Sequence, residues 1–230
     1  MSVGRRLLLF TKPTREGRVK TRLIGDLTPR EAALLHQAFL DDLLARLRPG
    51  NFDLGLAWAL DEGESVPEGP APGVAQRGED LGARLYHALA DAAAAARFVA
   101  AVGSDHPTLP LAAVEEAFAA LEAGAEIVLG PAEDGGYYLI ALAAERVSPR
   151  LFDGIAWSTD RVLDATLARC AELGLTPHLL APASDVDTPA DLARLAETLA
   201  LEDAAGSCPH TRALLALWGR LPQIPETAVR

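Results

Sequence analysis

The stretch RFVAAVGSDHPTLP (97–110) decides the fold class, because it joins a buried strand to a helix through a polar turn. Its first half, RFVAAVG (97–103), is a short continuous apolar run, which is typical of a strand buried on both faces. A helical pattern follows the turn and runs from Leu109 to Ala123. A buried strand followed at once by a helix is the repeating unit of α/β proteins.

The same alternation extends along the rest of the chain. Further apolar runs predict strands at RLLLF (6–10), FDLGLAWAL (52–60), AEIVLG (125–130) and YYLIAL (137–142). Helical periodicity predicts helices over Pro29 to Arg48, Asp80 to Ala96, Thr159 to Gly174 and Pro189 to Ala200. Strands that alternate with helices favour an α/β fold with a mostly parallel sheet, in which ligands bind at the carboxyl ends of the strands.

Local signals mark where several of these helices begin. Thr28 with Glu31 three residues later predicts a capping box, and Pro29 suits the first helical position. Thr188 with Asp191 repeats the arrangement, so Asp191 is assigned to helix capping. Ser158 is interpreted as the N-cap of the helix that follows it.

Composition and charge limit the functions open to this chain of 230 residues. Its net charge of −11 argues against nucleic-acid binding, which needs a broad basic face. The two cysteines form no CxxC pair, so a structural zinc site is not expected and a reducing cytoplasm is. The apolar run in MSVGRRLLLF is too short for a signal peptide, and no run approaches membrane-spanning length. We therefore expect a cytoplasmic protein without nucleic-acid or membrane partners.

By ordinary size limits, residues 1–200 are predicted to form one domain and residues 201–230 a C-terminal helical extension. The segment TRALLALWGRL (211–221) is amphipathic and is predicted to place Leu214, Leu217 and Trp218 on one face. That face would pack either on the domain or on a partner, and in the second case it could form a homodimer contact.

A cationic loop, TKPTREGRVKTRL (11–23), follows the first predicted strand. It carries five cationic side chains and one acid, in a chain that is acidic overall. Because Val19 and not glycine precedes Lys20, it is not a Walker A loop. A solvated basic loop is the alternative, but the position after a strand favours anion binding.

Acidic residues follow the strand at 97–103 and recur late in the chain. Asp105 lies in the turn after that strand, where a carboxylate suits a hard cation such as Mg²⁺. Alternatively, Asp105 or Ser104 only shapes the turn. In SDVDTPADL (184–192), Asp185 and Asp187 point to the same side of an extended chain, and either could complete a metal site with Asp105.

The stretch GPAEDGGYYLIAL (130–142) combines two acids, two glycines and two tyrosines. Gly135 and Gly136 would allow a ligand to approach the backbone closely. Glu133 and Asp134 could bind hydroxyl groups or act as a base, and a polar turn is the equal alternative. Trp157 either lines a pocket or belongs to the core.

Taken in order, these motifs resemble a known family. KPTREGRVKTRL, AFLDDLL, GSDHPTLP, GPAEDGGYYLIAL and DVDTPADL resemble a bacterial family of nucleotide-diphospho-sugar transferase-like proteins with the GT-A fold. Its members are usually labelled glycosyltransferases, and some are associated with arsenosugar biosynthesis. The chain is also similar to phospholactate guanylyltransferases and molybdenum-cofactor nucleotidyltransferases. The resemblance covers residues 6 to 200 and implies a three-layer α/β/α sandwich.

The resemblance also implies roles for particular residues. Asp105 matches the first metal-binding aspartate of the superfamily, in G-S-D rather than in a full DxD, and Asp187 matches the distal metal-binding position. Mg²⁺ or Mn²⁺ held there would bridge the donor's diphosphate, with Lys20 and Arg22 stabilising the same oxygens. The remaining residues implied in phosphate binding are Lys12, Arg15, Thr21 and Ser104. The segment EDGGYY, with Glu133, Asp134, Gly135, Gly136 and Tyr137, would face the sugar or a small-molecule acceptor, as would Trp157.

Three functions therefore remain open at this point. The first is a glycosyltransferase that uses a nucleotide sugar, which the family label favours. The second is a nucleotidyltransferase that releases pyrophosphate from a nucleoside triphosphate, which the cationic loop favours because a triphosphate carries more charge. The third is a non-catalytic nucleotide-binding module.

Overall fold

The computed structural model describes residues 4–201 and 208–222. The chain divides into two compact units, each assembled from separate stretches of sequence. Unit 1 contains residues 1–13, 49–103 and 110–184, and unit 2 contains residues 14–48, 104–109 and 185–230. Within the described ranges, no helix is both long enough and apolar enough to cross a bilayer.

Unit 1 is built on a seven-stranded sheet in the described part of the chain, with the order β3-β2-β1-β4-β6-β5-β7. The strands are β1 (Arg5–Thr11), β2 (Asp53–Trp58), β3 (Gly73–Ala75), β4 (Phe98–Gly103), β5 (Ile127–Pro131), β6 (Tyr137–Ala143) and β7 (His178–Leu179). Strand β6 runs antiparallel to β4 and β5, and the other neighbouring pairs are parallel. The predicted mostly parallel sheet is confirmed.

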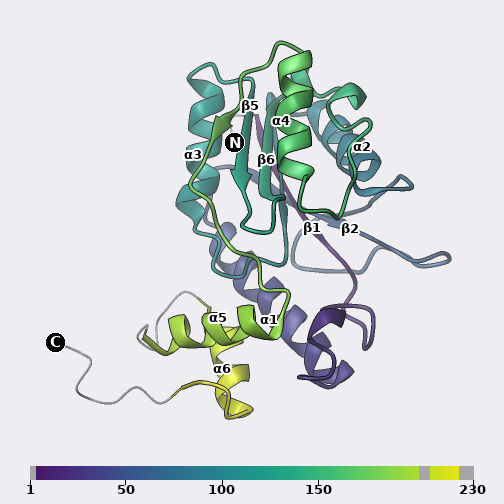
Figure 1. The fold of residues 1–230 in the computed structure, drawn as a ribbon. Coiled ribbons are helices and arrows are strands. Elements are labelled where there is room, and N and C mark those ends of the chain that lie inside the picture. Colours follow the sequence, from purple (N-terminus) through teal and green to yellow (C-terminus); the bar gives the residue numbers. More distant parts are fainter. Residues whose placement is uncertain (1–3, 202–207, 223–230) are drawn as a thin grey trace. The chain divides into compact units, whose positions relative to one another are not determined.

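Helices cover both faces of this sheet, which confirms the α/β/α sandwich. The helices of unit 1 are α2 (Leu81–Ala93), α3 (Leu111–Glu122) and α4 (Val162–Glu172), with short 3-10 turns at Ala144–Arg146 and Pro149–Leu151. Leu85 and Leu89 of α2 and Cys170 of α4 share one buried cluster with side chains of the central strands. Helix α3 packs against β5 and β6 outside that cluster, and Figure 1 shows it on the other side of these strands from α4.

The five strands predicted from apolar runs are all present, whereas β3 and β7 were not predicted. These two strands lie at the edges of the sheet and are three and two residues long. Their residues are mostly exposed, so neither has the apolar run that marks a buried strand.

Unit 2 contains helices packed around a second buried cluster. They are α1 (Pro29–Leu47), α5 (Pro189–Leu201) and α6 (Pro209–Leu217), preceded by a 3-10 turn, η1 (Thr21–Leu23). Leu35 and Phe39 of α1 contribute to the cluster, together with Leu195 of α5 and Leu215 of α6. The capping box of Thr28 with Glu31 is confirmed, and the predicted cap of α5 by Thr188 and Asp191 is also present.

The register of α6 differs from the prediction. Leu215 is fully buried, Leu214 and Trp218 pack beside it, and Leu217 is 80% exposed. The predicted apolar face was therefore wrong at Leu217, because the helix turns Leu215 and not Leu217 toward α1 and α5. Residues 202–207 and 223–230 of the predicted C-terminal extension lie outside the described residues, and the domain boundary at residue 200 stays a prediction.

The start of α4 also differs from the prediction. Ser158 has a left-handed backbone (φ 63°) and is not the N-cap, because the helix begins only at Val162. The intervening turn is held by Thr159, whose Oγ1 donates to the carbonyl of Ala156 at 2.7 Å.

Candidate functional site

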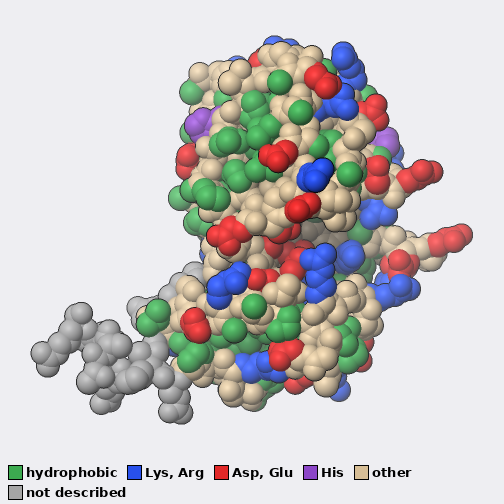
Figure 2. Space-filling view, viewed as in Figure 1, with side chains coloured by type: hydrophobic (Ala, Val, Ile, Leu, Met, Phe, Trp, Pro, Cys, Tyr) green, Lys and Arg blue, Asp and Glu red, His purple; other side chains and the backbone are tan. Residues whose placement is uncertain are grey.

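The cationic loop does not present all its charges to solvent. Lys12 is exposed and belongs to unit 1, whereas residues 14–23 belong to unit 2. Arg18 and Arg22 are exposed and Arg15 is half-buried, but Lys20 is buried. On the face drawn in Figure 2, basic side chains lie among acidic ones.

A strained backbone turns Lys20 inward. Lys20 adopts the left-handed conformation (φ 47°, ψ 39°), which is uncommon for a residue with a side chain. The buried neighbours Val19 and Leu23 anchor the loop on either side of it. The carbonyl of Lys20 accepts a hydrogen bond from the amide of Leu23 at 2.9 Å, which starts η1. Strain of this kind persists only where surrounding contacts hold it, and it occurs often at functional sites.

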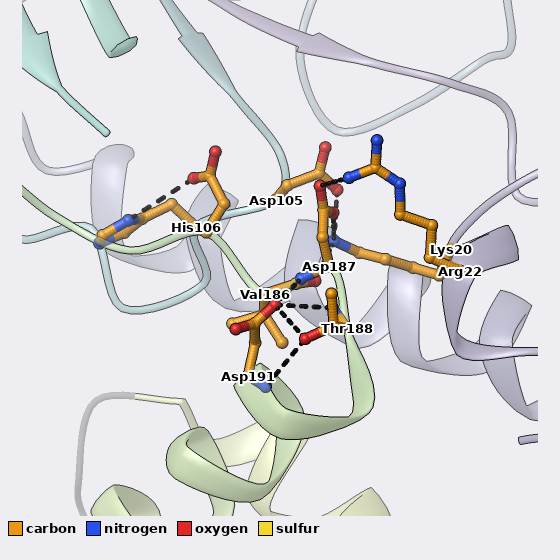
Figure 3. A network of polar contacts seen from close by, with 9 residues as sticks. Lys20, Arg22, Asp105, His106, Val186, Asp187, Thr188 and Asp191 are labelled. Carbon is orange, nitrogen blue, oxygen red and sulfur yellow. Dashed lines mark hydrogen bonds and ion pairs between the residues drawn. The ribbon is translucent and has the colours of Figure 1, made fainter. Parts of the chain in front are cut away.

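The ammonium group of Lys20 lies between two predicted metal ligands. Its Nζ is 2.5 Å from Asp105 Oδ1 and 3.4 Å from Asp187 Oδ1, and it donates to the carbonyl of Val186 at 2.7 Å. The ring of Phe39 lies below it, with its centroid 5.0 Å from Nζ. Figure 3 shows the two carboxylates meeting at this ammonium group.

The site is open on the carboxylate side and closed on the lysine side. The side chain of Lys20 is 2% exposed, whereas those of Asp105 and Asp187 are 47% and 36% exposed. Arg22 approaches from solvent, and its Nη1 lies 3.4 Å from Asp187 Oδ2. A ligand in solution would therefore meet Asp105, Asp187 and Arg22 before it met Lys20.

Backbone contacts hold the two acids in place. The amide of Val186 donates to the carbonyl of Asp105 at 2.9 Å, which joins the segment after β4 to the segment before α5. The carboxylate of Asp191 accepts from the amides of Asp187 and Thr188 at 3.1 and 2.7 Å. Burial raises the pKa of Asp191, but these hydrogen bonds outweigh it and lower the pKa. Asp191 thus caps α5, as predicted, and also fixes the backbone of Asp187.

The structure distinguishes Asp187 from Asp185, which in the sequence only the family resemblance did. Asp185 Oδ1 lies 3.9 Å from Nδ1 of the buried His106, and Figure 3 shows His106 pointing away from the Lys20 group. Burial, and to a lesser extent the positive charge of nearby Arg46, lowers the pKa of His106 to about 4, so the ring is neutral at neutral pH. Asp187 shares the ammonium group of Lys20 with Asp105.

The Asp105–Asp187 pair has the chemistry of a site for a hard cation. Its oxygens converge on one positive charge, and Mg²⁺ is commonly held by one or two carboxylates together with substrate phosphates and water. Among the described residues, no group of three or more His, Cys, Asp and Glu side chains could hold a metal ion. The pair therefore fits a cation that takes its remaining ligands from a bound substrate.

Ser104 and Thr21, the other two residues of unit 2 discussed as phosphate ligands, differ in their exposure to solvent. Ser104 is 3% exposed, directly before Asp105. Thr21 is exposed and begins η1. Their predicted contact with phosphate stays a prediction.

The acid–glycine segment of unit 1 forms the turn between β5 and β6. Glu133 and Asp134 are both exposed. Asp134 Oδ1 accepts from the amide of Gly136 at 2.9 Å, so one of its oxygens shapes the turn. Gly135 has φ +88°, and a Cβ there would lie 2.0 Å from the carbonyl oxygen of Asp160. Glycine is therefore required at position 135 because the backbone of Asp160 approaches it closely.

Trp157 and Tyr137 contact one another in unit 1. Their rings are edge to face, with centroids 6.4 Å apart. The indole of Trp157 lies on Gly82 at the start of α2, where a Cβ would come within 2.4 Å of Nε1. The hydroxyl group of Tyr137 is buried, and burial raises the pKa of this tyrosine. Both rings are thus packed against the protein, and their predicted contact with a sugar or acceptor stays a prediction.

Sequence reasoning missed three groups that define the site. These are the carbonyl of Val186, the ring of Phe39 and the left-handed backbone of Lys20. The first two lie far from Lys20 in sequence, and no local pattern marks them. The third has no signal in the sequence, because glycine, asparagine and aspartate are the residues that mark a left-handed backbone.

Two solved structures with low sequence identity share the fold of this chain. The structure resembles CMP:2-keto-3-deoxy-manno-octonic acid synthetase complexed with CTP, with a TM-score of 0.53 and 12% identity over 93% of this chain and 99% of that chain. It also resembles a cytidylyltransferase from Leptospira borgpetersenii serovar Hardjo-bovis, with a TM-score of 0.52 and 13% identity over 98% of each chain.

A closer similarity identifies the family. A protein from Desulfovibrio desulfuricans G20, provisionally assigned as a nucleotide-diphospho-sugar transferase, shares 32% identity over 96% of this chain and 97% of its own, with a TM-score of 0.87. Residues 51–159 match the family described as "Uncharacterized protein conserved in bacteria (DUF2064)". Because of its similarity to the Desulfovibrio protein, the chain belongs to the same family as that protein, as the resemblance predicted. Among curated proteins, none matches the sequence.

Proposed function

We propose that this protein is a transferase that binds a nucleotide-activated donor at the Asp105–Asp187 pair and transfers its sugar to a small acceptor. One observation carries the proposal: two acids from separate segments converge on Lys20 Nζ while their other sides remain open to solvent. Membership of one family with the Desulfovibrio protein, assigned as a nucleotide-diphospho-sugar transferase, supports this choice of donor.

The residues of unit 2 would divide the work between them. Asp105 and Asp187 would hold Mg²⁺ or Mn²⁺ together with the donor's phosphates. A cation so placed supplies neutralisation of the charge that develops on the leaving phosphate. Arg22, exposed beside Asp187, would contact phosphate oxygens directly, because a guanidinium group suits that geometry. In unit 1, the turn containing Glu133 and Asp134 would meet the sugar or acceptor.

Nucleotidyl transfer is the second candidate. Its support is the likeness in fold to a cytidylyltransferase and to a synthetase complexed with CTP. The cations of residues 11–23 also suit a triphosphate, because a triphosphate carries more negative charge than a diphosphate. The two reactions differ in what they release, since glycosyl transfer gives a nucleoside diphosphate and nucleotidyl transfer gives pyrophosphate.

The test compares Asp187→Asn with Asp185→Asn as a matched control. Binding of nucleotide sugars, diphosphates and triphosphates would be measured by calorimetry with Mn²⁺ or Mg²⁺. Asp187→Asn should weaken binding by at least about tenfold, as loss of a metal-site group typically does, and Asp185→Asn should leave it nearly unchanged. Equal effects of the two variants would contradict the assigned site.

The released product then decides between the reactions. Phosphorus NMR of the wild-type protein with each bound donor would detect a nucleoside diphosphate or pyrophosphate. Release of diphosphate from a nucleotide sugar supports glycosyl transfer. Release of pyrophosphate from a triphosphate would contradict glycosyl transfer and support nucleotidyl transfer instead.

A further inference from the structure

The Asp105–Asp187 pair already has a cation bound to it, namely the ammonium group of Lys20. Nζ lies within 3.4 Å of one oxygen of each carboxylate. A divalent cation at this pair would therefore face a positive charge that belongs to the protein. Like charges at such short range repel strongly when one of them is buried.

Lys20 cannot leave this position easily. Its ammonium group also donates to the carbonyl of Val186 and lies over the ring of Phe39. Its side chain is 2% exposed and its backbone is held in the left-handed conformation. The lysine approaches the acids from the interior, so moving it toward solvent would break the hydrogen bond and the ring contact together.

Charge balance then discriminates between ligands. Asp105 and Asp187 carry two negative charges, and Lys20 and Arg22 beside them carry two positive ones, so the charges of these four side chains sum to zero. A free divalent cation would leave the group with two uncompensated positive charges. A cation that arrives with phosphate groups brings its own negative charge and also supplies acceptors for Arg22.

We propose that Lys20 is the built-in counter-ion of the Asp105–Asp187 pair, so that the pair rejects free divalent cations and accepts them only together with the phosphates of a nucleotide. That the phosphates belong to a nucleotide rests on the proposed function, whereas the role of Lys20 against the free cation does not. Nucleotide and metal would then bind with strong positive coupling, and each would raise the other's affinity by the same factor.

The test measures Mn²⁺ binding to nucleotide-free protein by electron paramagnetic resonance. Lys20→Met removes the charge and keeps the length of the side chain, and Lys20→Gln is the second variant in case the first fails to fold. Both should bind Mn²⁺ at least about tenfold more tightly than the wild-type protein. Arg30→Met removes an exposed cation from α1 of the same unit and should change the affinity little.

Adding a nucleoside diphosphate completes the experiment. The Mn²⁺ affinity of the wild-type protein should then rise by at least about tenfold and approach that of the variants. Unchanged or weaker Mn²⁺ binding in both Lys20 variants without nucleotide would overturn the role of Lys20. If tighter binding in the variants is found but no nucleotide affects the wild-type protein, the counter-ion role stands and the proposed function fails.

Discussion

Replacing Asp42 by Asn tests how unit 2 holds its last helix. Asp42 lies on α1 and is 1% exposed, and its carboxylate accepts hydrogen bonds from α6. The donors are the amide of His210 at 2.9 Å, the amide of Thr211 at 2.9 Å and the hydroxyl group of Thr211 at 2.6 Å. Amides in the first turn of a helix have no partner within that helix, so Asp42 caps α6 from another element.

The expected cost follows from these contacts. Asn keeps one acceptor oxygen, but its amide nitrogen would point a donor at a group that itself donates. A hydrogen bond to a charged group contributes about 1.5–3 kcal/mol, and the loss of a negative charge from a helix N-terminus adds about 0.3–1 kcal/mol. We therefore expect Asp42→Asn to lower the free energy of unfolding of unit 2 by about 3 kcal/mol.

Asp41 provides a matched control next to it in sequence. It is half-buried and accepts one hydrogen bond, from Gln37 Nε2 at 2.9 Å, so Asp41→Asn should cost about 1 kcal/mol or less. Urea denaturation gives the free energies, and hydrogen exchange at the amides of His210 and Thr211 shows whether α6 is what opens. Equal losses in the two variants, or unchanged exchange at those amides, would refute the assignment of Asp42 as a cap.

Three further outcomes follow from the geometry. Gly135→Ala should destabilise unit 1 by more than about 2 kcal/mol, because φ is +88° there and the new Cβ would lie 2.0 Å from a backbone oxygen. Gly136→Ala should cost much less in the same thermal melt, because its Cβ would lie 3.2 Å from a side-chain oxygen. The pKa of His106 is lowered from 6.5 to about 4, so as the pH falls the unfolded chain binds the proton before the folded one does. The contribution of the neutral ring to the free energy of unfolding is fully present above pH 6.5 and should be lost toward pH 4, by up to about 3 kcal/mol. Urea titrations at stepped pH should show this slope in the wild-type protein and not in His106→Gln. Burial raises the pKa of Cys170 to about 11, so this thiol should not react with a disulfide reagent at pH 8 unless urea is added; fast reaction in the native protein would contradict its burial.

The features of the fold that the sequence predicted depend on neighbouring residues. The continuous apolar runs became the central strands, and Thr28 with Glu31 became a capping box, because each needs only a few consecutive side chains. The strands β3 and β7 and the exposure of Leu217 depend on which distant segment lies alongside. No local pattern contains that information, so these features were missed.

The same distinction explains what was predicted of the site. Asp105 and Asp187 were identified by their places after a strand and before a helix, and the structure brings both to Lys20. From the pattern alone Asp185 was an alternative, since an extended chain does not separate it from Asp187, and only the family resemblance favoured Asp187. The separation comes from the buried ring of His106, which lies beside Asp185.

Lys20 shows why counting charges in a loop is insufficient to assign them a ligand. In the sequence it is one of five cations that suit an anion, and in the structure its charge is directed at the protein's own carboxylates. Because it neutralises the pair from beneath, the charge that an incoming phosphate would meet comes from Arg22 and from any cation that accompanies the phosphate. If both proposals hold, the loop contributes to two functions: its exposed cations attract the ligand, and its buried Lys20 controls the acidic pair.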